Sequence, residues 1–378
     1  MGQTVECGRA AGFEMNNVGL IDRPAASGVD RVGVHSAETV LPADHPRVMA
    51  RKVGVVLLNL GTPDGTDYWS MRRYLGEFLS DKRVIDYPGW LWQPLLQLII
   101  LKKRPFTSGA AYRSIWNEEL DESPLRTVTR SQSDKLAERL QARHPEIVVD
   151  WAMRYGNPSI ESVLERLAEQ GCNRIAFMAL YPQYAAPTTA TAYDKAFEAL
   201  TKMRWQPAIR TMGPYHDEPG YIDLLAKSVE RHLATLDWEP EKLIMSYHGV
   251  PKRFLMSGDP YHCMCNKTTR LVRERLGWPK DRVMVCFQSR FGPEEWLQPY
   301  LDETLEHLPK EGVKRIAVVS PAFATDCVET LEEINQEGRD EFLEAGGEQF
   351  TYIPCLNDDD AHMDFLAELA RRETMGWL

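Results

Sequence analysis

His248 is a candidate for chemistry because it directly follows an apolar run, residues 243–246, that is typical of a buried strand. Gly249 leaves the space around it open, and Pro251 stiffens the chain that leads away. A neutral imidazole here could bind a metal ion or accept a proton, because the unperturbed pKa of histidine is about 6.5. The alternative is a histidine whose nitrogens are satisfied by local hydrogen bonds.

An acidic row comes later in the chain, where Glu329, Glu333 and Glu337 are spaced four residues apart in a segment of helical periodicity. At ~100° per residue they cover roughly 80° of one helix face. We expect Thr325 or Asp326 to cap this helix, which puts Glu329 in its first turn. Such a row could carry a hard cation or protons. The alternative is a solvated helix face, because apolar side chains fall on the other side.

Other candidates are weaker when each is taken alone. Arg154 follows another strand-like run, and its planar guanidinium could bind a carboxylate through two bonds. Trp296 lies soon after a further run, where tryptophan is more often a core residue than a ligand contact. Cys263 and Cys265 form a CxC pair, but zinc sites usually add a second close pair. No GxGxxG loop follows the first strand and no Walker loop occurs, so nucleotide binding lacks its usual signature.

Apolar runs that alternate with helical patterns must position these residues. Strands that alternate with helices predict an α/β fold of parallel sheets with helices on both faces. Ligands of such sheets lie beyond the carboxyl ends of the strands, which is where His248 and Arg154 fall. The predicted strands are residues 53–58, 147–153, 175–180, 243–246, 283–287 and 316–320, and the main predicted helices are 67–79, 160–170, 221–236, 268–276, 300–308 and 328–345.

An internal similarity divides the chain into two halves. The heptapeptide GCNRIAF at 171–177 matches GVKRIAV at 312–318, and each follows a helix and leads into a threonine-containing helix start. We therefore predict an internal duplication that produces two related lobes, with two sets of strand ends around one cleft. The predicted parts are a lobe at 51–235 with an insertion near 88–130, a lobe at 236–345, and a C-terminal segment and helix at 346–378.

The composition is that of a globular protein, with 378 residues of which 43% are hydrophobic and 26% charged. The formal net charge of −11 argues against a nucleic-acid partner, which would need a basic face. Seven scattered cysteines and no recognisable secretory leader favour a reducing, cytoplasmic compartment. Residues 1–50 keep no apolar periodicity, and we expect them to form a disordered extension.

The most apolar segment is LWQPLLQLIIL at 91–101, which is too short for the ~20 residues that span a bilayer. Trp90 precedes it, and Lys102, Lys103 and Arg104 follow it. This order of aromatic, apolar and basic residues fits either a buried core helix or an exposed apolar lip. A lip of this kind would contact a membrane surface or an apolar ligand.

Several longer motifs together resemble the ferrochelatase family, and the resemblance covers nearly the whole chain from Lys52 onward. Each motif alone is modest evidence, but all occur in the family's order. They are LLNLGTP at 57–63, MRYGNP at 153–158, YPQY at 181–184, SYHGVP at 246–251, GDPY at 258–261, FQSRFGPEEWLQPYLDETL at 287–305 and PAFATDCVETLEEI at 321–334.

The resemblance implies a fold, an activity and a set of site residues. The fold is two Rossmann-like lobes around a porphyrin cleft, and the activity is insertion of Fe²⁺ into protoporphyrin IX to form protoheme, with release of two protons. His248 and Glu329 would share proton acceptance and metal binding, in an order that the sequence leaves open. The acidic row continues with Glu333 and Glu337, the lip includes Arg104, and the pocket-lining positions are Leu60, Arg154, Tyr155 and Trp296.

Two departures from the family pattern limit what is carried over. Cys327 stands where animal members have a histidine, so no role for that histidine transfers. The chain has no cysteine-rich tail, so we expect no [2Fe–2S] cluster and no required cofactor, with Fe²⁺ as a substrate. Leu60 stands where members that use coproporphyrin tend to have tyrosine, which favours protoporphyrin IX.

The expected partners are therefore small molecules and a membrane surface. Nitrogen and carboxylate ligands bind Zn²⁺ more tightly than Fe²⁺, so we expect Zn²⁺ to be accepted as well. The lip predicts weak association at the inner face of the membrane, and no oligomeric state is inferred. Two rival interpretations are a tetrapyrrole chelatase for cobalt or nickel, and a non-catalytic two-lobe binding protein of the periplasmic type.

Overall fold

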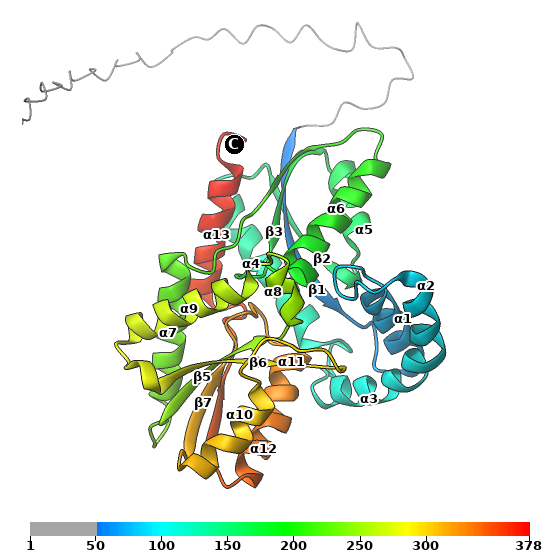
Figure 1. Ribbon diagram of the computed structural model, residues 1–378. Coiled ribbons are helices and arrows are strands. Elements are labelled where there is room, and N and C mark those ends of the chain that lie inside the picture. Colours follow the sequence, from blue (N-terminus) through cyan, green and yellow to red (C-terminus); the bar gives the residue numbers. More distant parts are fainter. Residues whose placement is uncertain (1–50) are drawn as a thin grey trace, which may run out of the picture. The chain divides into compact units, whose positions relative to one another are not determined.

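The computed structural model describes residues 51–378, which belong to one compact unit (Figure 1). The extension predicted at residues 1–50 lies outside the described residues. Within the described part, two separate four-stranded sheets carry the fold.

The first sheet has the strand order β2-β1-β3-β4, and every pair in it is parallel. Its strands are β1 (Lys52–Thr62), β2 (Ile147–Gly156), β3 (Cys172–Ala179) and β4 (Ala208–Thr211). The central strand β1 is buried along nearly its whole length, as its uninterrupted apolar run requires when helices cover both faces. The short edge strand β4, which is mostly exposed, was not predicted.

The second sheet repeats this arrangement with the order β6-β5-β7-β8, again all parallel. Its strands are β5 (Lys242–His248), β6 (Val283–Gln288), β7 (Arg315–Val319) and β8 (Gln349–Ile353). The equal strand order supports the predicted duplication, and the two-lobe α/β fold is confirmed. Strand β8 was not predicted, and it brings part of the predicted C-terminal segment into the second sheet.

Helices cover both faces of both sheets. One continuous apolar core joins β1 to β5 through α4 (Pro124–Gln141), α7 (Pro219–Leu233), α9 (Tyr261–Leu276) and α13 (Asp360–Thr374). The outer face of the first sheet packs on α5 (Ile160–Glu169) and α6 (Thr191–Lys202). The outer face of the second packs on α10 (Leu301–His307) and α12 (Arg339–Glu344). The remaining short helices are α8 (Lys252–Met256) and α11 (Val328–Leu331).

The segment predicted as an insertion, near 88–130, contributes α2 and α3 to a helical group beside the first sheet, where they lie together with α1, which precedes it in the chain (Figure 1). These helices are α1 (Tyr68–Leu79), α2 (Gly89–Leu95) and α3 (Leu101–Ser114), and a π-helical turn (Leu96–Ile100) joins the last two. Leu96 and Leu101 are buried, whereas Leu91, Leu95 and Leu98 are exposed. The segment therefore has one core face and one exposed apolar face.

Candidate active site

His248 is the last residue of β5 and lies in register with Gln288 at the end of β6. Its Nδ1 is 2.7 Å from the carbonyl oxygen of Gly249. A carbonyl can only accept a hydrogen bond, so Nδ1 carries the proton and the Nε2 lone pair of the neutral ring is left for another partner. The side chain is half-buried. This combination suits a metal ligand or a proton acceptor.

Trp296 packs against the loop that follows His248. A Cβ on Gly249 would lie 2.8 Å from the carbonyl oxygen of Gln288 and 3.1 Å from the indole ring of Trp296, so only glycine fits here without displacement. The ring of Phe291 lies 5.0 Å from that of Trp296, and the guanidinium of Arg104 lies 5.7 Å from Phe291. The basic end of the lip thus approaches Phe291 in the segment that follows β6 of the second lobe.

Glu329 lies in the first turn of α11, as expected, but the helix begins differently from the prediction. The cap is Cys327, whose sulfur accepts from the backbone N–H of Thr330 while its own N–H donates to the Thr330 hydroxyl at 3.0 Å. The predicted cap at Thr325 or Asp326 was therefore wrong. The carboxylate of Asp326 instead accepts from the same Thr330 hydroxyl, at 3.0 Å.

The acidic row is not carried by one regular α-helix, contrary to the prediction for 328–345. A π-helical turn (Glu333–Gly338) follows α11, with the N–H of Glu337 bonded to the carbonyl of Glu332 at 3.0 Å. The wider turn breaks the four-residue spacing, so Glu337 is exposed while Glu332 becomes half-buried. Glu332 was not predicted as a site residue, because on a regular α-helix it would lie on a different face from Glu329, Glu333 and Glu337.

A chain of hydrogen bonds links the end of β6 to this helix. The hydroxyl of Ser246 donates to Gln288 at 2.6 Å, and Gln288 Nε2 donates to the carbonyl of Glu329 at 2.7 Å. The hydroxyl of Ser289 donates to the carboxylate of Glu333 at 2.6 Å. Gln288 is therefore both the register partner of His248 and a direct anchor of the Glu329 turn.

Burial and crowding make two neighbouring carboxylates, Glu333 of the row and Glu332 beside it, hold protons more strongly than usual. Burial raises the pKa of Glu333 although the Ser289 hydrogen bond and nearby His248 oppose the shift, and the charge of Glu329 adds to it. Burial together with the carboxylates of Glu337, Glu333 and Glu329 raises the pKa of Glu332 to about 7. Glu332 can thus hold a proton near neutral pH.

Three tyrosines of the first lobe lie within electrostatic reach of Glu329. Burial raises the pKa of Tyr74, Tyr112 and Tyr181, and the negative charge of Glu329 contributes in each case. Tyr74 donates to the carbonyl of Gly61 at 3.2 Å, just beyond Leu60 on β1. None of the three was predicted as a site residue, although Tyr181 directly follows a predicted strand and that position was a usable signal.

Arg154 is engaged inside the protein. Its guanidinium pairs with Asp81, its Nε donates to Thr191 at 2.6 Å, and it lies 4.3 Å from the ring of Tyr155. Tyr155 is fully buried and its hydroxyl donates to Asp81 at 2.8 Å. The expected use of Arg154 for an external carboxylate would have to compete with Asp81. Leu60 is half-buried at the end of β1 and packs on the cluster that contains Tyr74 and Tyr155.

The CxC pair is split between two environments, since Cys263 is exposed and Cys265 is fully buried in the shared core. Among residues 51–378, no group of three or more His, Cys, Asp or Glu side chains is arranged to hold a metal ion. A cavity of about 280 Å³ beside Thr62 and Tyr74 and one of about 460 Å³ beside Tyr300 and His307 are lined by neither His248 nor Glu329.

Comparison with known proteins decides the family. The ferrochelatase family model matches residues 52–374. The chain belongs to the ferrochelatase family. The ferrochelatases of Allorhizobium ampelinum and Agrobacterium fabrum are each 61% identical to it, over 89% and 90% of this chain and 98% of each relative. The ferrochelatase of Rhodobacter capsulatus is 61% identical over 89% of this chain and 97% of its own length.

The fold is also similar to that of solved structures whose sequences differ widely from this chain. The structure of SirB from Bacillus subtilis with Fe³⁺ superposes with a TM-score of 0.51 at 13% identity, covering 86% of this chain and 97% of SirB. At that identity it supports the chelatase-type fold alone. Membership of the ferrochelatase family makes the chain an enzyme that inserts ferrous iron into protoporphyrin in heme synthesis. No helix within residues 51–378 is long and apolar enough to cross a membrane.

Proposed function

We propose that this ferrochelatase inserts the metal between the loop after β5 and the start of α11, with His248 and Glu329 at the reacting centre. One observation carries the proposal: Gln288 pairs in register with His248 and donates to the carbonyl of Glu329 at 2.7 Å. A single buried side chain thereby connects the segments that bear an imidazole and a carboxylate. These are ligand types that suit Fe²⁺, and they bind Zn²⁺ more tightly, so Zn²⁺ is also a substrate.

His248 takes a pyrrole proton in this proposal, because its Nδ1 is occupied by the Gly249 carbonyl and Nε2 is the available base. Glu329 receives the metal or passes protons on to Glu333. The raised pKa values of Glu333 and Glu332 are consistent with side chains that hold a transferred proton. Glu337, which is exposed, is the end of the relay toward solvent.

The porphyrin is protoporphyrin IX, held by apolar contact with Leu60, Trp296 and the lip that ends at Arg104. A flat macrocycle shields its nitrogens, and a site that bends it must supply about 1–5 kcal/mol of strain from contact elsewhere on the ring. Arg154 and Tyr155 do not contact the porphyrin in this proposal. They support the contact surface through Asp81, to which both side chains bond. The enzyme needs no resident cofactor, and a [2Fe–2S] cluster is not expected.

The lip also associates weakly with the inner face of the cytoplasmic membrane. Trp90 is 80% exposed and Leu98 is 61% exposed, on the same short segment that ends in exposed Lys102, Lys103 and Arg104. An apolar face beside basic residues is the pattern of a helix that lies in the membrane interface. Protoporphyrin is itself poorly soluble in water, so a lip at the membrane would meet it there.

The test is the loss of protoporphyrin fluorescence when metal is supplied to wild-type protein and to His248→Ala. We expect turnover with Fe²⁺ and Zn²⁺, and no turnover in His248→Ala, whose porphyrin affinity stays close to wild type because binding is mostly apolar. His144→Ala, on a partly exposed histidine at the far end of β2, is the matched control. Near-normal rates in His248→Ala would remove His248 from the mechanism, and turnover with Co²⁺ or Ni²⁺ alone would favour the rival chelatases.

A further inference from the structure

Asn357 lies in the turn between β8 and α13 and has a left-handed backbone, with φ of 48°. Its backbone groups are fully used by hydrogen bonds. The N–H donates to the carbonyl of Ala324 at 3.0 Å, and the carbonyl accepts from Gln132 Nε2 at 2.9 Å and from His362 Nδ1 at 2.7 Å. This unusual conformation is therefore held from three sides, by α4 of the first lobe, by α13 and by the loop before α11.

The side chain of Asn357 holds Asp326 through two bonds. Its Oδ1 accepts from the backbone N–H of Asp326 at 2.8 Å, and its Nδ2 donates to Asp326 Oδ2 at 2.7 Å. The other carboxylate oxygen of Asp326 accepts from the hydroxyls of Tyr352 at 2.7 Å and Thr330 at 3.0 Å. Asp326 is buried, so these bonds form in a region of low dielectric where each one is strong.

The contacts of Asn357 converge on the residues that flank Glu329. Asp326 lies three residues before Glu329, and Thr330, which directly follows it, bonds to Asp326 and Cys327. Fully buried Gln132 of α4 adds a bond from the hydroxyl of Thr325 at 3.3 Å. The start of α11 is thereby fastened to both lobes.

We propose that Asn357 is a positioning residue for metal insertion, which fixes the start of α11 and so the place of Glu329. The inference rests on the proposed role of Glu329 and adds a residue that does not touch the substrates. Shifts of about 1 Å in a reacting group can cost 10²-fold in rate. A loosened helix start therefore lowers kcat while the apolar binding of porphyrin is unchanged.

Two variants isolate the side chain of Asn357. Asn357→Gly keeps the left-handed backbone, which glycine adopts freely, and removes both bonds to Asp326. Asn357→Asp keeps the size but sets a second carboxylate against Asp326. The double variant Asp326→Asn with Asn357→Asp restores both bonds with the amide and carboxylate exchanged, and it keeps an oxygen for Tyr352 and Thr330.

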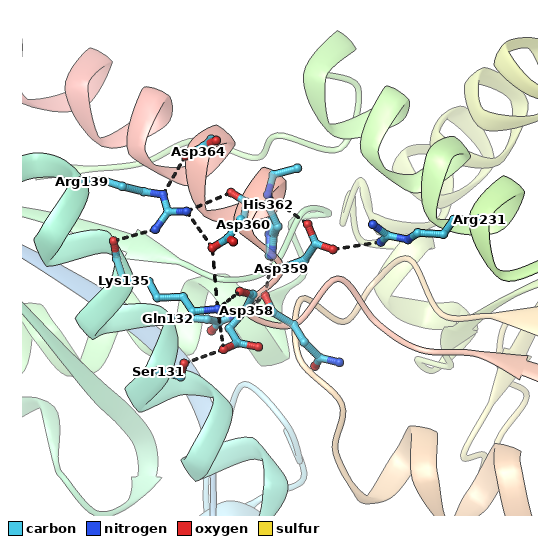
Figure 2. A network of polar contacts seen from close by, with 12 residues as sticks. Ser131, Gln132, Lys135, Arg139, Arg231, Asp358, Asp359, Asp360, His362 and Asp364 are labelled. Atoms are coloured by element: carbon cyan, nitrogen blue, oxygen red, sulfur yellow. Dashed lines mark hydrogen bonds and ion pairs between the residues drawn. The ribbon is translucent and has the colours of Figure 1, made fainter.

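The control removes a bond from the same interface that does not lead to Asp326. Figure 2 shows Ser131, Lys135 and Arg139 of α4 meeting the acidic residues at the start of α13. Ser131→Ala deletes the bond from its hydroxyl to Asp358, which is 2.6 Å long. It tests whether loosening the interface is enough to slow the enzyme.

The measurement is kcat with Fe²⁺ and Zn²⁺, porphyrin Kd by fluorescence, and Tm for each variant. We expect kcat to fall on the order of ten- to a hundredfold in Asn357→Gly and Asn357→Asp, Kd to stay within about twofold, and the exchange variant to recover most of the rate. Ser131→Ala keeps the wild-type kcat. A normal kcat in Asn357→Gly, an equal loss in Ser131→Ala, or no recovery in the exchange variant overturns the inference.

Combination with Glu329→Gln separates this inference from the proposed function. If Asn357 acts through Glu329, adding Asn357→Gly to Glu329→Gln lowers kcat little further, because interacting sites are not additive. A full additional loss in the double variant means that Asn357 acts elsewhere and overturns the inference alone. A wild-type rate in Glu329→Gln itself overturns the proposed function, whatever Asn357→Gly does.

Discussion

The hydroxyl of Ser289 lies 2.6 Å from the carboxylate oxygen Oε2 of Glu333 and donates to it. Ser289 has a positive φ of 65°, a conformation that residues other than glycine rarely adopt and that is enriched at functional sites. The bond ties a carboxylate of the π-helical turn to the end of β6, beside the strand that ends at His248. The middle carboxylate of the acidic row is thus held by the residue that follows β6, whereas Glu337 at the far end of the row is exposed.

This arrangement predicts graded effects along the row. Glu329→Gln removes the carboxylate nearest the reacting centre and should lower kcat by 10²–10⁴-fold, the usual worth of general acid–base groups. Glu333→Gln should cost less, and Glu337→Gln least, because Glu337 is already exposed to water. The measurement is kcat with Fe²⁺ and with Zn²⁺, and Glu344→Gln on the exposed face of α12 is the control. Equal and small losses across the row would mean that it is only a solvated face.

Gly249→Ala should separate Trp296 from the His248 loop. The added methyl group would lie 2.8 Å from the backbone oxygen of Gln288, which cannot move without breaking its own bond to the N–H of Gly249. We expect a loss of about 1–3 kcal/mol in the free energy of unfolding and a rise in the KM for porphyrin. Gly213→Ala is the control, because its methyl group would meet no atom within 4 Å. Unchanged KM in Gly249→Ala would contradict the place given to Trp296 in porphyrin binding.

Replacing both Leu95 and Leu98 with serine should weaken binding to anionic lipid vesicles and raise the KM for porphyrin. Both side chains are exposed, at 43% and 61%, so the substitution removes apolar contact without opening the core. Co-flotation with vesicles and steady-state kinetics measure the two effects, and Leu120→Ser, which is equally exposed but lies outside the apolar run, is the control. The lip assignment fails if neither quantity differs from wild type.

His362 should make stability depend on pH in the mildly acidic range. Burial lowers its pKa to about 4, although the hydrogen bond to Asn357 opposes this shift, whereas the unfolded chain titrates near 6.5. Between pH 6.5 and pH 4 the histidine of the unfolded state binds a proton that the histidine of the folded state does not bind. The free energy of unfolding therefore falls as the pH drops through this window. The loss from pH 6.5 to pH 5 is about 2 kcal/mol at ~1.4 kcal/mol per unit.

The measurement is urea unfolding of wild type and His362→Asn at pH 6.5 and pH 5. Asparagine keeps an N–H near the position of Nδ1 but does not titrate, so the pH-dependent difference should shrink by about the amount attributed to His362. His307→Asn, on an exposed histidine, should leave the pH dependence as it is in wild type. An undiminished difference in His362→Asn would assign the acid sensitivity to other groups.

Local pattern predicted the strands and the strand-end position of His248, because burial on both faces leaves a continuous apolar run such as that of β1. It failed where structure depends on distant partners. Arg154 and Asp81 are 73 residues apart in the sequence, and the residues around Arg154 give no sign that the two side chains are paired. The π-helical turn at Glu333–Gly338 was also not predicted, because the spacing of the glutamates fits a regular α-helix equally well. Asn357 was passed over because its neighbours in sequence look like an ordinary turn.

Leu60 and His248 occupy matching places, since each comes after the apolar run of the central strand in a sheet of the same order. One lobe presents a side chain suited to apolar contact there, and the other presents an imidazole. Under the proposed roles, a substitution at Leu60 would change which tetrapyrrole is accepted, whereas a substitution at His248 would change the rate of metal insertion.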